Sequence, residues 1–414
     1  MTRLTNWSGN VTFTATELHR PSTIAELRSL VAGSDRVRVL GTGHSFNEIA
    51  DTDGVLVSIE DLPKVLDIDA ERGSVRVSGG IRYGELTGFL EANGLALANL
   101  GSLPHISVAG ACATGTHGSG DRNSILAAAV SGLTLVTADG TLIELSRADK
   151  DFPGAVVGLG SLGVVIELTL DVLPSYQLYQ YVYDDLPVRT LCENFDELTG
   201  SAYSVSMFTR WQADRIDQVW LKSLEPRPAG EALFGALPAA LARHPVGGDP
   251  SFATQQLGVG GPWQQRLPHF RLEFTPSSGA EIQSEYFVAR EHAVPAIQAV
   301  SGLAELLAPV LQIAEIRTVA ADELWISPCY QQDRVALHFT WILDQARVEP
   351  VVAELERRLA DFQAVPHWAK LFLIEPEPLA ALHPRLAEFA NLVRRYDPTG
   401  TFANAFTHRY LPAG

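Results

Sequence analysis

The sequence predicts an α+β protein with two domains. The chain has 414 residues, more than the roughly 250 to 300 that one hydrophobic core usually organises, so two cores are expected. Its first part mixes short strand patterns with helical ones, and longer strand patterns dominate its second part. Pro174 stands between the two parts, and proline disfavours the interior of both strands and helices. We therefore predict a first domain over residues 1–174 and a second one from residue 175 onward.

The predicted first domain begins with a helix. Thr23-Ile-Ala-Glu26 has the form of a capping box, and apolar residues then recur at helical spacing until Gly33. A second helix is predicted from Arg82 to Asn93, and Gly94 ends it. Asp139-Gly140 is a hairpin turn signal. Apolar or alternating runs predict strands at 37–40, 55–59, 65–68, 74–78, 133–136, 141–145 and 164–173.

The second domain is predicted to hold an antiparallel sheet with helices on one face. Helical patterns lie at Pro295–Leu307 and Glu349–Phe362, and an amphipathic one at Pro384–Tyr396. The Pro- and Gly-rich stretch 226–262 predicts loop with short helical pieces. Strand patterns occur at 176–183, 203–209, 218–221, 281–288, 311–319 and 334–341.

Composition indicates a soluble protein that acts on small molecules. The apolar fraction of 46% allows an ample core, and the net charge of −17 disfavours nucleic acid and anionic membranes as partners. The chain contains neither a signal-peptide pattern nor an apolar run of about 18 residues, so we expect a cytoplasmic protein without a membrane partner. Cys112, Cys192 and Cys329 form no C-x-x-C pair, which favours free thiols over a disulfide framework or a metal site. We expect a monomer.

Two glycine-rich segments suggest that the backbone wraps a large ligand. The first follows the strand pattern at 37–40, where Gly41 and Gly43 allow amide groups to converge on an anion and His44 supplies a reactive side chain. Taken alone, this segment is more typical of a tight turn. The second segment, Gly101 to Gly120, contains no carboxylate, Lys or Arg, yet 108–113 is too apolar for a solvated linker.

A third glycine motif raises a rival hypothesis. Gly158-Leu-Gly160-Ser-Leu-Gly163 matches the dinucleotide fingerprint of nicotinamide dehydrogenases. That fingerprint requires a strand before it and a helix after it. Here the residues that follow, 164–173, alternate with period two and are β-branched, so they predict a strand. This reversed context argues against a nicotinamide site.

Together, the first two segments resemble the FAD-binding domain of the vanillyl-alcohol-oxidase type flavoproteins. The resemblance rests on Gly41-Thr-Gly-His-Ser45, on Ser102-Leu-Pro-His-Ile-Ser107-Val-Ala-Gly110 and on Ala113-Thr-Gly-Thr-His117-Gly, and it is closest to the branch of alditol and aldonolactone oxidases. It runs nearly end to end. It implies a two-subdomain FAD-binding domain, a substrate-binding cap domain over 175–370, and a C-terminal segment, 371–414, that returns to the FAD-binding domain.

The resemblance also implies how the cofactor is held. In this family the histidine that matches His44 is bonded covalently to the methyl carbon on the benzenoid ring of the flavin, so we expect FAD attached through His44. Val165 would offer its backbone to the flavin, and Gly101 would lie near the flavin carbon that reduces dioxygen. The other implied FAD-binding residues are Leu40, Gly41, Thr42, Gly43, Ser45, Ser102, Ser107, Gly110, Ala113, Thr114, Gly115, Thr116 and His117.

Two strand patterns of the second domain carry polar residues on one face. Glu315 and Arg317 are two residues apart, as are His338 and Thr340, so each pair shares a face of its strand. From spacing alone, a solvated sheet face with an ordinary salt bridge is the better interpretation. Two further observations favour a site instead. Helices are expected on only one face of this sheet, and these polar residues resemble the pattern of the alditol and aldonolactone oxidase branch.

Lys370 is a third candidate. It lies in His367-Trp-Ala-Lys370, which resembles the His-Trp-x-Lys signature of the lactone-oxidase branch. The 31 basic residues include few lysines, namely Lys64, Lys150, Lys222 and Lys370. A lysine in a chain that otherwise uses arginine suggests a need for a compact point charge, although a chance occurrence is the alternative.

The resemblance and the polar residues together imply an FAD-dependent oxidase of acyclic polyols such as xylitol and sorbitol. The enzyme would oxidise the C1 hydroxyl to the aldose by hydride transfer to flavin N5 and would reduce dioxygen to hydrogen peroxide. We expect His338 to act as base, Arg317 and Lys370 to hold the C1 oxygen, and Glu315 and Ser102 to bind neighbouring hydroxyls. No metal is expected.

Two other functions are kept as alternatives. An aldonolactone oxidase or dehydrogenase of the same fold would share His44 and the His-Trp-x-Lys element. A sugar-binding protein without redox activity would keep the fold alone. Several buried polar groups are costly unless they are paired, and a chain of substrate hydroxyls pairs them well, which favours the polyol.

Overall fold

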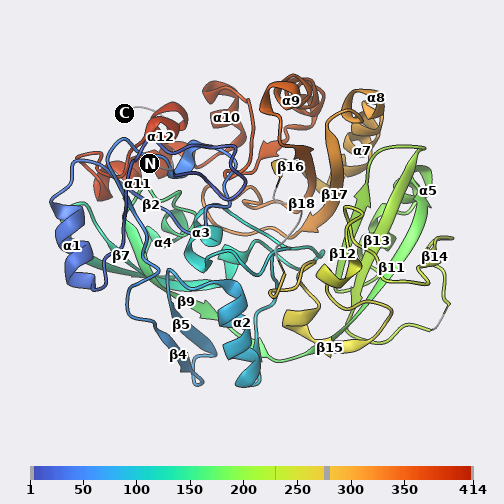
Figure 1. Ribbon diagram of the computed structural model, residues 1–414, viewed down its shortest axis with the longest axis horizontal. Helices are drawn as coiled ribbons and strands as arrows, with labels where there is room; N and C mark the ends of the chain where they lie inside the picture. Colours follow the sequence, from blue (N-terminus) through green and yellow to red (C-terminus); the bar gives the residue numbers. More distant parts are fainter. Residues whose placement is uncertain (1–3, 229, 275–279, 412–414) are drawn as a thin grey trace.

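A computed structural model describes residues 4–228, 230–274 and 280–411, and it has the predicted mixture of helices and mainly antiparallel sheets (Figure 1). In the first part of the chain, β1 (Leu18–His19), β3 (Val55–Val57) and β2 (Val37–Val39) form a small parallel sheet beside α1 (Ile24–Ala32). A second, antiparallel sheet has the order β4-β5-β9-β7-β8. Its strands are Leu66–Asp69, Ser74–Ser78, Val164–Asp171, Val130–Val136 and Leu142–Ser146.

Short elements connect these two sheets. They are α2 (Tyr83–Ala92), β6 (Leu95–Ala96), α3 (Val108–Ala113), α4 (Phe152–Ala155) and β10 (Leu173–Pro174), which pairs with β6. The helix α3 occupies the apolar middle of the second glycine-rich segment. The turn 158–163 leads directly into β9, so the strand predicted after the third glycine motif is confirmed.

The second part of the chain folds around one large antiparallel sheet, in which the described strands have the order β14-β11-β13-β12-β17-β18-β16-β19, with β15 paired to β11. The long strands are β11 (Gln177–Pro187), β12 (Ser204–Thr209), β13 (Arg215–Ser223), β16 (Glu281–Ala289), β17 (Leu311–Val319) and β18 (Arg334–Ile342). The short ones are β14 (Leu237–Pro238), β15 (Gly260–Pro262) and β19 (Val365–Pro366).

Helices cover the outer face of this sheet. Figure 1 shows α7 (Ala293–Ser301), α8 (Ala304–Leu307) and α9 (Gln345–Leu359) on one side of β16, β17 and β18, with α3 on the other side. The helices α5 (Val188–Glu193) and α6 (Phe195–Thr199) follow β11. Apolar residues that alternate along the strands, such as Ile316, Leu337 and Phe339, are buried in the core that includes these helices. The polar residues of the same strands therefore face the first part of the chain.

The C-terminal helices α10 (Pro376–Leu382), α11 (Leu386–Tyr396) and α12 (Ala405–Tyr410) lie beside the first part of the chain. The amide of Val37 donates to the carbonyl of Thr401 over 2.7 Å, and Asn404 Nδ2 donates to the carbonyls of Glu48, Ile49 and Asp51. These contacts join the end of the chain to its first part, and the division into 1–174, 175–370 and 371–414 remains a prediction.

Three details differ from the sequence-based expectations. The predicted helix at Pro295–Leu307 is divided into α7, which ends at its C-cap Gly302, and α8. The capping box before α1 is only half formed, since Glu26 accepts from the amide of Ser22 instead of that of Thr23. The stretch 226–262, of which Ala229 lies outside the described residues, contributes the edge strands β14 and β15 and one short helical turn at Pro250–Phe252.

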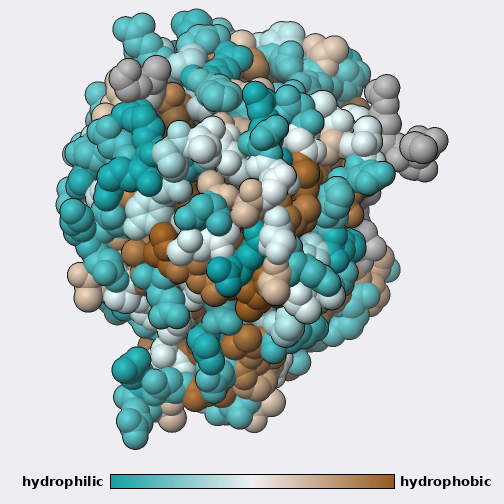
Figure 2. Space-filling view, turned by 90° about the vertical axis from the view of Figure 1, so that its left-hand side faces the viewer, coloured by the Kyte–Doolittle hydropathy of each residue, from teal (hydrophilic) through white to brown (hydrophobic). Residues whose placement is uncertain are grey.

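Hydrophilic side chains cover most of the face shown in Figure 2, and apolar ones gather near its middle. Cys112, Cys192 and Cys329 are free thiols, as predicted. Among the described residues, no helix is both long enough and apolar enough to cross a membrane.

Candidate active site

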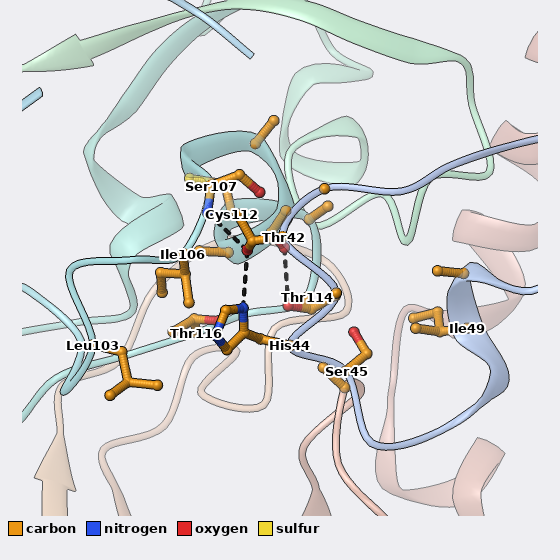
Figure 3. A pocket seen from close by; sticks show the side chains of 18 of the residues that line it. Thr42, His44, Ser45, Ile49, Leu103, Ile106, Ser107, Cys112, Thr114 and Thr116 are labelled. Carbon is orange, nitrogen blue, oxygen red and sulfur yellow. Dashed lines mark hydrogen bonds between the residues drawn. The ribbon is translucent and has the colours of Figure 1, made fainter. Parts of the chain in front are cut away.

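The loop after β2 is shaped by its two glycines. Gly43 has a φ of 71°, which a residue with a side chain rarely adopts. At Gly41, an added Cβ would lie 2.5 Å from Ser107 Oγ, so the absence of a side chain lets this loop approach the start of α3. Thr42 Oγ1 joins the two segments: it accepts from the amide of Ser107 over 3.3 Å and lies 3.0 Å from His44 Nδ1 (Figure 3).

His44 is an uncharged imidazole at the wall of a cavity. Its ring stacks on Trp7 with a centroid distance of 5.0 Å. Burial, helped by the charge of Lys370, lowers the pKa of His44 to about 4, so the ring is neutral at pH 7. His44 Nε2 is buried and has no hydrogen-bond partner within the described part of the chain. A neutral, buried ring of this kind can react with an electrophilic carbon without first losing a proton.

One continuous cavity runs from this loop to the large sheet. At one end it passes α3 and the turn 158–163, and at the other it reaches β16, β17 and β18. Most of the predicted FAD-binding residues line it, namely Leu40, Gly41, Thr42, Gly43, His44, Ser45, Ser102, Ser107, Gly110, Ala113, Thr114, Thr116, His117 and Val165. Gly101 and Gly115 are not among the described residues that line it, although both lie in the same segment.

The predicted substrate-binding residues meet at the far end of this cavity. Glu315, Arg317, His338, Thr340 and Lys370 all line it together with Ser102. The exposed fraction of Arg317 is 5% and that of Glu315 is 4%. This burial rules out the alternative of a solvated sheet face with an ordinary surface salt bridge.

Glu285, which was not predicted from the sequence, organises this end of the cavity. It lies on β16 directly opposite His338 of β18. Its carboxylate accepts from Arg317 Nη2 over 2.5 Å and from His117 Nε2 over 3.1 Å, and its Oε2 lies 3.5 Å from His338 Nδ1. Burial raises the pKa of Glu285, but His117, Arg317 and His338 together outweigh it and hold the pKa well below the usual range.

Arg317 therefore bridges two buried carboxylates. Its Nε lies 3.6 Å from Glu315 Oε2, and its Nη1 donates to Ser102 Oγ over 3.4 Å. Burial lowers the pKa of Arg317, yet Glu315 and Glu285 raise it above its ordinary value. The guanidinium stays charged, and it ties Ser102 to the sheet.

The two ring nitrogens of His338 have different neighbours. Nδ1 faces the Glu285 carboxylate at 3.5 Å, and Nε2 lies 3.3 Å from Thr340 Oγ1. A carboxylate beside Nδ1 favours a proton on that nitrogen, which leaves the lone pair on Nε2. The imidazole can then accept a proton through Nε2 while Glu285 stabilises the resulting charge.

Lys370 lies between the cap sheet and the loop of His44. Its Nζ donates to Gln283 Oε1 and lies 4.9 Å from the centre of the Phe46 ring. Asn47, which follows His44 in the same loop, donates through Nδ2 to the carbonyls of Trp368 and Lys370 over 2.8 Å. These bonds join the loop of His44 to the segment that carries Lys370. Burial lowers the pKa of Lys370 to about 8, while Glu285 opposes the shift.

Further polar residues at the cavity wall were also missed. Glu281 and Gln283 precede Glu285 on β16 with the same period of two, which is a signal that the sequence offered. His367 lines the cavity beside the predicted Lys370. His269 comes from the loop between Trp263–Gln265 and β16, for which no element or site was predicted, and its Nε2 lies 2.8 Å from Glu315 Oε1.

Both parts of the chain match family models, and known proteins resemble it along nearly its whole length. Residues 18–146 match the model of an FAD binding domain, and residues 280–410 match that of D-arabinono-1,4-lactone oxidase. An alditol oxidase from a Streptomyces species is 50% identical, with 99% of each chain covered. An L-gulono-1,4-lactone dehydrogenase of Mycobacterium tuberculosis is 30% identical, with 98% of each chain covered.

A solved structure has the same fold. The crystal structure of cholesterol oxidase from B. sterolicum superimposes with a TM-score of 0.81 and covers 99% of this chain and 96% of its own, at 14% sequence identity. At this identity the similarity concerns the fold alone. It supports the predicted two-subdomain FAD-binding domain with an α+β cap.

Proposed function

Because the chain belongs to the family of FAD-dependent oxidases that includes alditol oxidase and the aldonolactone oxidases and dehydrogenases, we propose that it oxidises acyclic polyols such as xylitol and sorbitol. The product would be the aldose, with hydrogen peroxide formed from dioxygen. The observation that carries this proposal is the polar cavity wall of Ser102, Glu315, Arg317, His338 and Lys370, of which Glu315, Arg317 and His338 are buried. This wall holds both acceptors and donors, so a chain of hydroxyls can pair with them, whereas an apolar alcohol would leave them unpaired.

The residues present fit FAD. The glycine loop at 41–43 allows close backbone approach, and the neutral ring of His44 at the cavity wall supports covalent attachment through this residue. When bound, FAD supplies the acceptor for the hydride that leaves the substrate carbon. The cavity lining from Leu40 to Ser45 and along α3 would hold the cofactor, and Val165 would contribute from β9.

The protein side of the mechanism follows from the charges. His338 would take the hydroxyl proton on Nε2, with Glu285 stabilising the imidazolium through Nδ1. Arg317 and Lys370 would hold the C1 oxygen as negative charge develops on it. Glu315 and Ser102 would bind the neighbouring hydroxyls, since a carboxylate accepts from a hydroxyl and Ser102 Oγ can donate to one.

We further propose that the protein works as a cytoplasmic monomer without a membrane or nucleic-acid partner. The net charge of −17 supports the absence of nucleic-acid binding, because such a charge repels phosphates. The three free thiols are compatible with a reducing compartment.

The visible spectrum of the purified protein tests the proposal. We expect a yellow protein whose colour stays with the pellet after acid precipitation, and whose colour is bleached by xylitol without oxygen. An aldonolactone oxidase, favoured by the family model at 280–410, would be bleached by a lactone and not by xylitol. A colourless protein would contradict any flavin function, and colour in the supernatant would contradict attachment through His44.

Lys370 makes the activity depend on pH. Its pKa of about 8 means that the ammonium is present at pH 7 and is lost as pH rises through 8, so kcat/KM for xylitol should fall above pH 8. Lys370→Ala should lower kcat/KM about 100-fold at pH 7 and remove this decline, because the charge is then absent at every pH. Lys64→Ala, which removes an exposed lysine, serves as the control. Wild-type kinetics of Lys370→Ala would show that Lys370 has no role in the site.

Gly101→Val should reduce the reaction with dioxygen selectively. An added Cβ at Gly101 would lie 3.5 Å from Thr116 Cγ2 and 3.7 Å from Ile106 Cδ1, so the first carbon fits and the branched methyl groups would crowd these cavity residues. We expect the rate of anaerobic bleaching by xylitol to change little and the rate of reoxidation by oxygen to fall at least about tenfold. Unchanged reoxidation would contradict an oxygen path beside Gly101. Stopped-flow absorbance measures both rates.

A further inference from the structure

Glu315 has a second buried partner outside the sheet. Its Oε1 accepts from His269 Nε2 over 2.8 Å, and the side chains of both residues are nearly inaccessible to solvent. His269 belongs to the loop that precedes β16, after the short helical turn Trp263–Gln265. Burial raises the pKa of Glu315, but Arg317 and His269 outweigh it and hold the pKa well below its usual range. The carboxylate is therefore ionised and accepts only.

The His269 ring is locked in place. Phe208 and Trp220 of the large sheet meet it edge to face, with centroid distances of 5.2 and 5.4 Å. Lys222 Nζ lies 3.4 Å from His269 Nδ1 and also donates to the carbonyl of Leu267. Among the described residues, the ring has two polar partners, one for each nitrogen.

These two partners determine the tautomer of His269. An ionised carboxylate only accepts, so Nε2 must carry the hydrogen, and Nδ1 of the neutral ring is left to accept. Burial lowers the pKa of Lys222 to about 7, and either protonation state of its amino group has an N–H to donate to Nδ1. Burial, helped by the charge of Lys222, lowers the pKa of His269 to about 4, which keeps the ring neutral. Lys222, with an exposed fraction of 1%, is one of the few lysines of the chain.

The same loop also holds Ser102. The amide of His269 donates to the carbonyl of Ser102 over 3.1 Å, and the amide of Phe270 approaches the same oxygen at 3.3 Å. The loop is fixed in turn by Thr254, whose amide donates to the carbonyl of His269 over 3.0 Å. Ser102 and Glu315 come from distant parts of the sequence, and one loop sets the position of both.

We propose that His269, held in one tautomer by Lys222, is a positioning residue that aims the Glu315 carboxylate at a substrate hydroxyl. This role rests on the proposed function, and the hydroxyls concerned are those that flank the reacting carbon of the polyol. With Oε1 occupied by His269, Glu315 presents Oε2 to the cavity beside Arg317. Without His269, the carboxylate can turn toward the guanidinium, and its acceptor leaves the hydroxyl position.

Kinetics of matched variants test this role. His269→Leu should raise KM for xylitol about tenfold or more, because a hydrogen bond to a charged group is lost, while kcat stays within about threefold. His269→Gln retains an N–H donor and should recover most of the KM. In a Glu315→Gln background, His269→Leu should add little, since the two residues act through one contact. The flavin absorbance of each variant checks that the fold and the cofactor site are intact.

Additive effects of the two substitutions, an unchanged KM, or a loss of kcat alone would overturn the proposal. Nitrogen NMR of histidine-labelled protein provides a readout that does not depend on turnover. The wild-type spectrum should show His269 as the Nε2–H tautomer, and Lys222→Met should add signals of the Nδ1–H form. A wild-type protein that does not oxidise xylitol would contradict the proposed function. An Nδ1–H or doubly protonated His269 ring would contradict the role of His269.

Discussion

Replacing Arg317 by methionine should lower kcat/KM for xylitol about 1,000-fold while the flavin stays attached. Arg317 bridges Glu285 and Glu315, and its removal leaves two buried carboxylates without their main counter-charge. Losing one partner of a buried ion pair costs about 3 to 5 kcal/mol, so one carboxylate should take up a proton and the protein should lose stability. Steady-state kinetics and the free energy of unfolding in urea measure both effects.

Arg290 provides a matched control. It also bridges two carboxylates, those of Asp121 and Asp196, but at a more exposed position away from the cavity. Arg290→Met should reduce stability by about 1 kcal/mol or less and leave kcat/KM unchanged. Arg317→Lys keeps one charge but not the planar fork, so its activity should fall between that of Arg317→Met and the wild type. Equal losses for Arg290→Met and Arg317→Met would show a general effect on folding and contradict a role of Arg317 in the site.

Local periodicity was enough to predict part of the site. A strand turns successive side chains to opposite faces, so Glu315 and Arg317, like His338 and Thr340, could be assigned to common faces from spacing alone. Whether that face meets solvent or another domain is not a local property. It depends on the packing of the cap sheet against the first part of the chain, and for that reason the sequence left the solvated alternative open.

Glu285 shows what periodicity cannot supply. Glu281, Gln283 and Glu285 share a face of β16 by the same rule, yet their partners depend on register. The pairing of β16 with β18 puts Glu285 opposite His338, and the pairing of β17 with β18 puts Glu315 opposite the same histidine. No local pattern in either strand specifies these pairings, so the second carboxylate of the site was missed.

His269 was beyond sequence reasoning for a different reason. Its loop follows the stretch 226–262, whose proline and glycine content gives no periodic signal. Tertiary contacts with Lys222, 47 positions away, and with Glu315, 46 positions away, determine its conformation. The glycine-rich segments were easier to interpret, because a positive φ at Gly43 and the close approach at Gly41 are properties of the residue type.

His338→Ala should lower kcat for xylitol about 100- to 10,000-fold, the range expected when a general base is removed. Nε2 of His338 lies beside Thr340 at the cavity wall, and the Glu285 carboxylate faces Nδ1 on the other side of the ring. Without the imidazole, the substrate hydroxyl must lose its proton to hydroxide. The residual activity should therefore rise with pH up to about 8, above which the loss of the Lys370 charge opposes it.

Stopped-flow bleaching of the flavin by xylitol without oxygen isolates this step from the reaction with dioxygen. Thr340→Val keeps the imidazole and should slow bleaching only a few-fold, about the effect of one neutral hydrogen bond. His383→Phe removes a buried histidine that stacks on Trp368 outside the described cavity lining, and it should leave bleaching unchanged. If the flavin of His338→Ala is bleached at a rate within about tenfold of the wild-type rate, a group other than His338 accepts the hydroxyl proton. Glu315 would then be the next group to test, since it is ionised and lines the same end of the cavity.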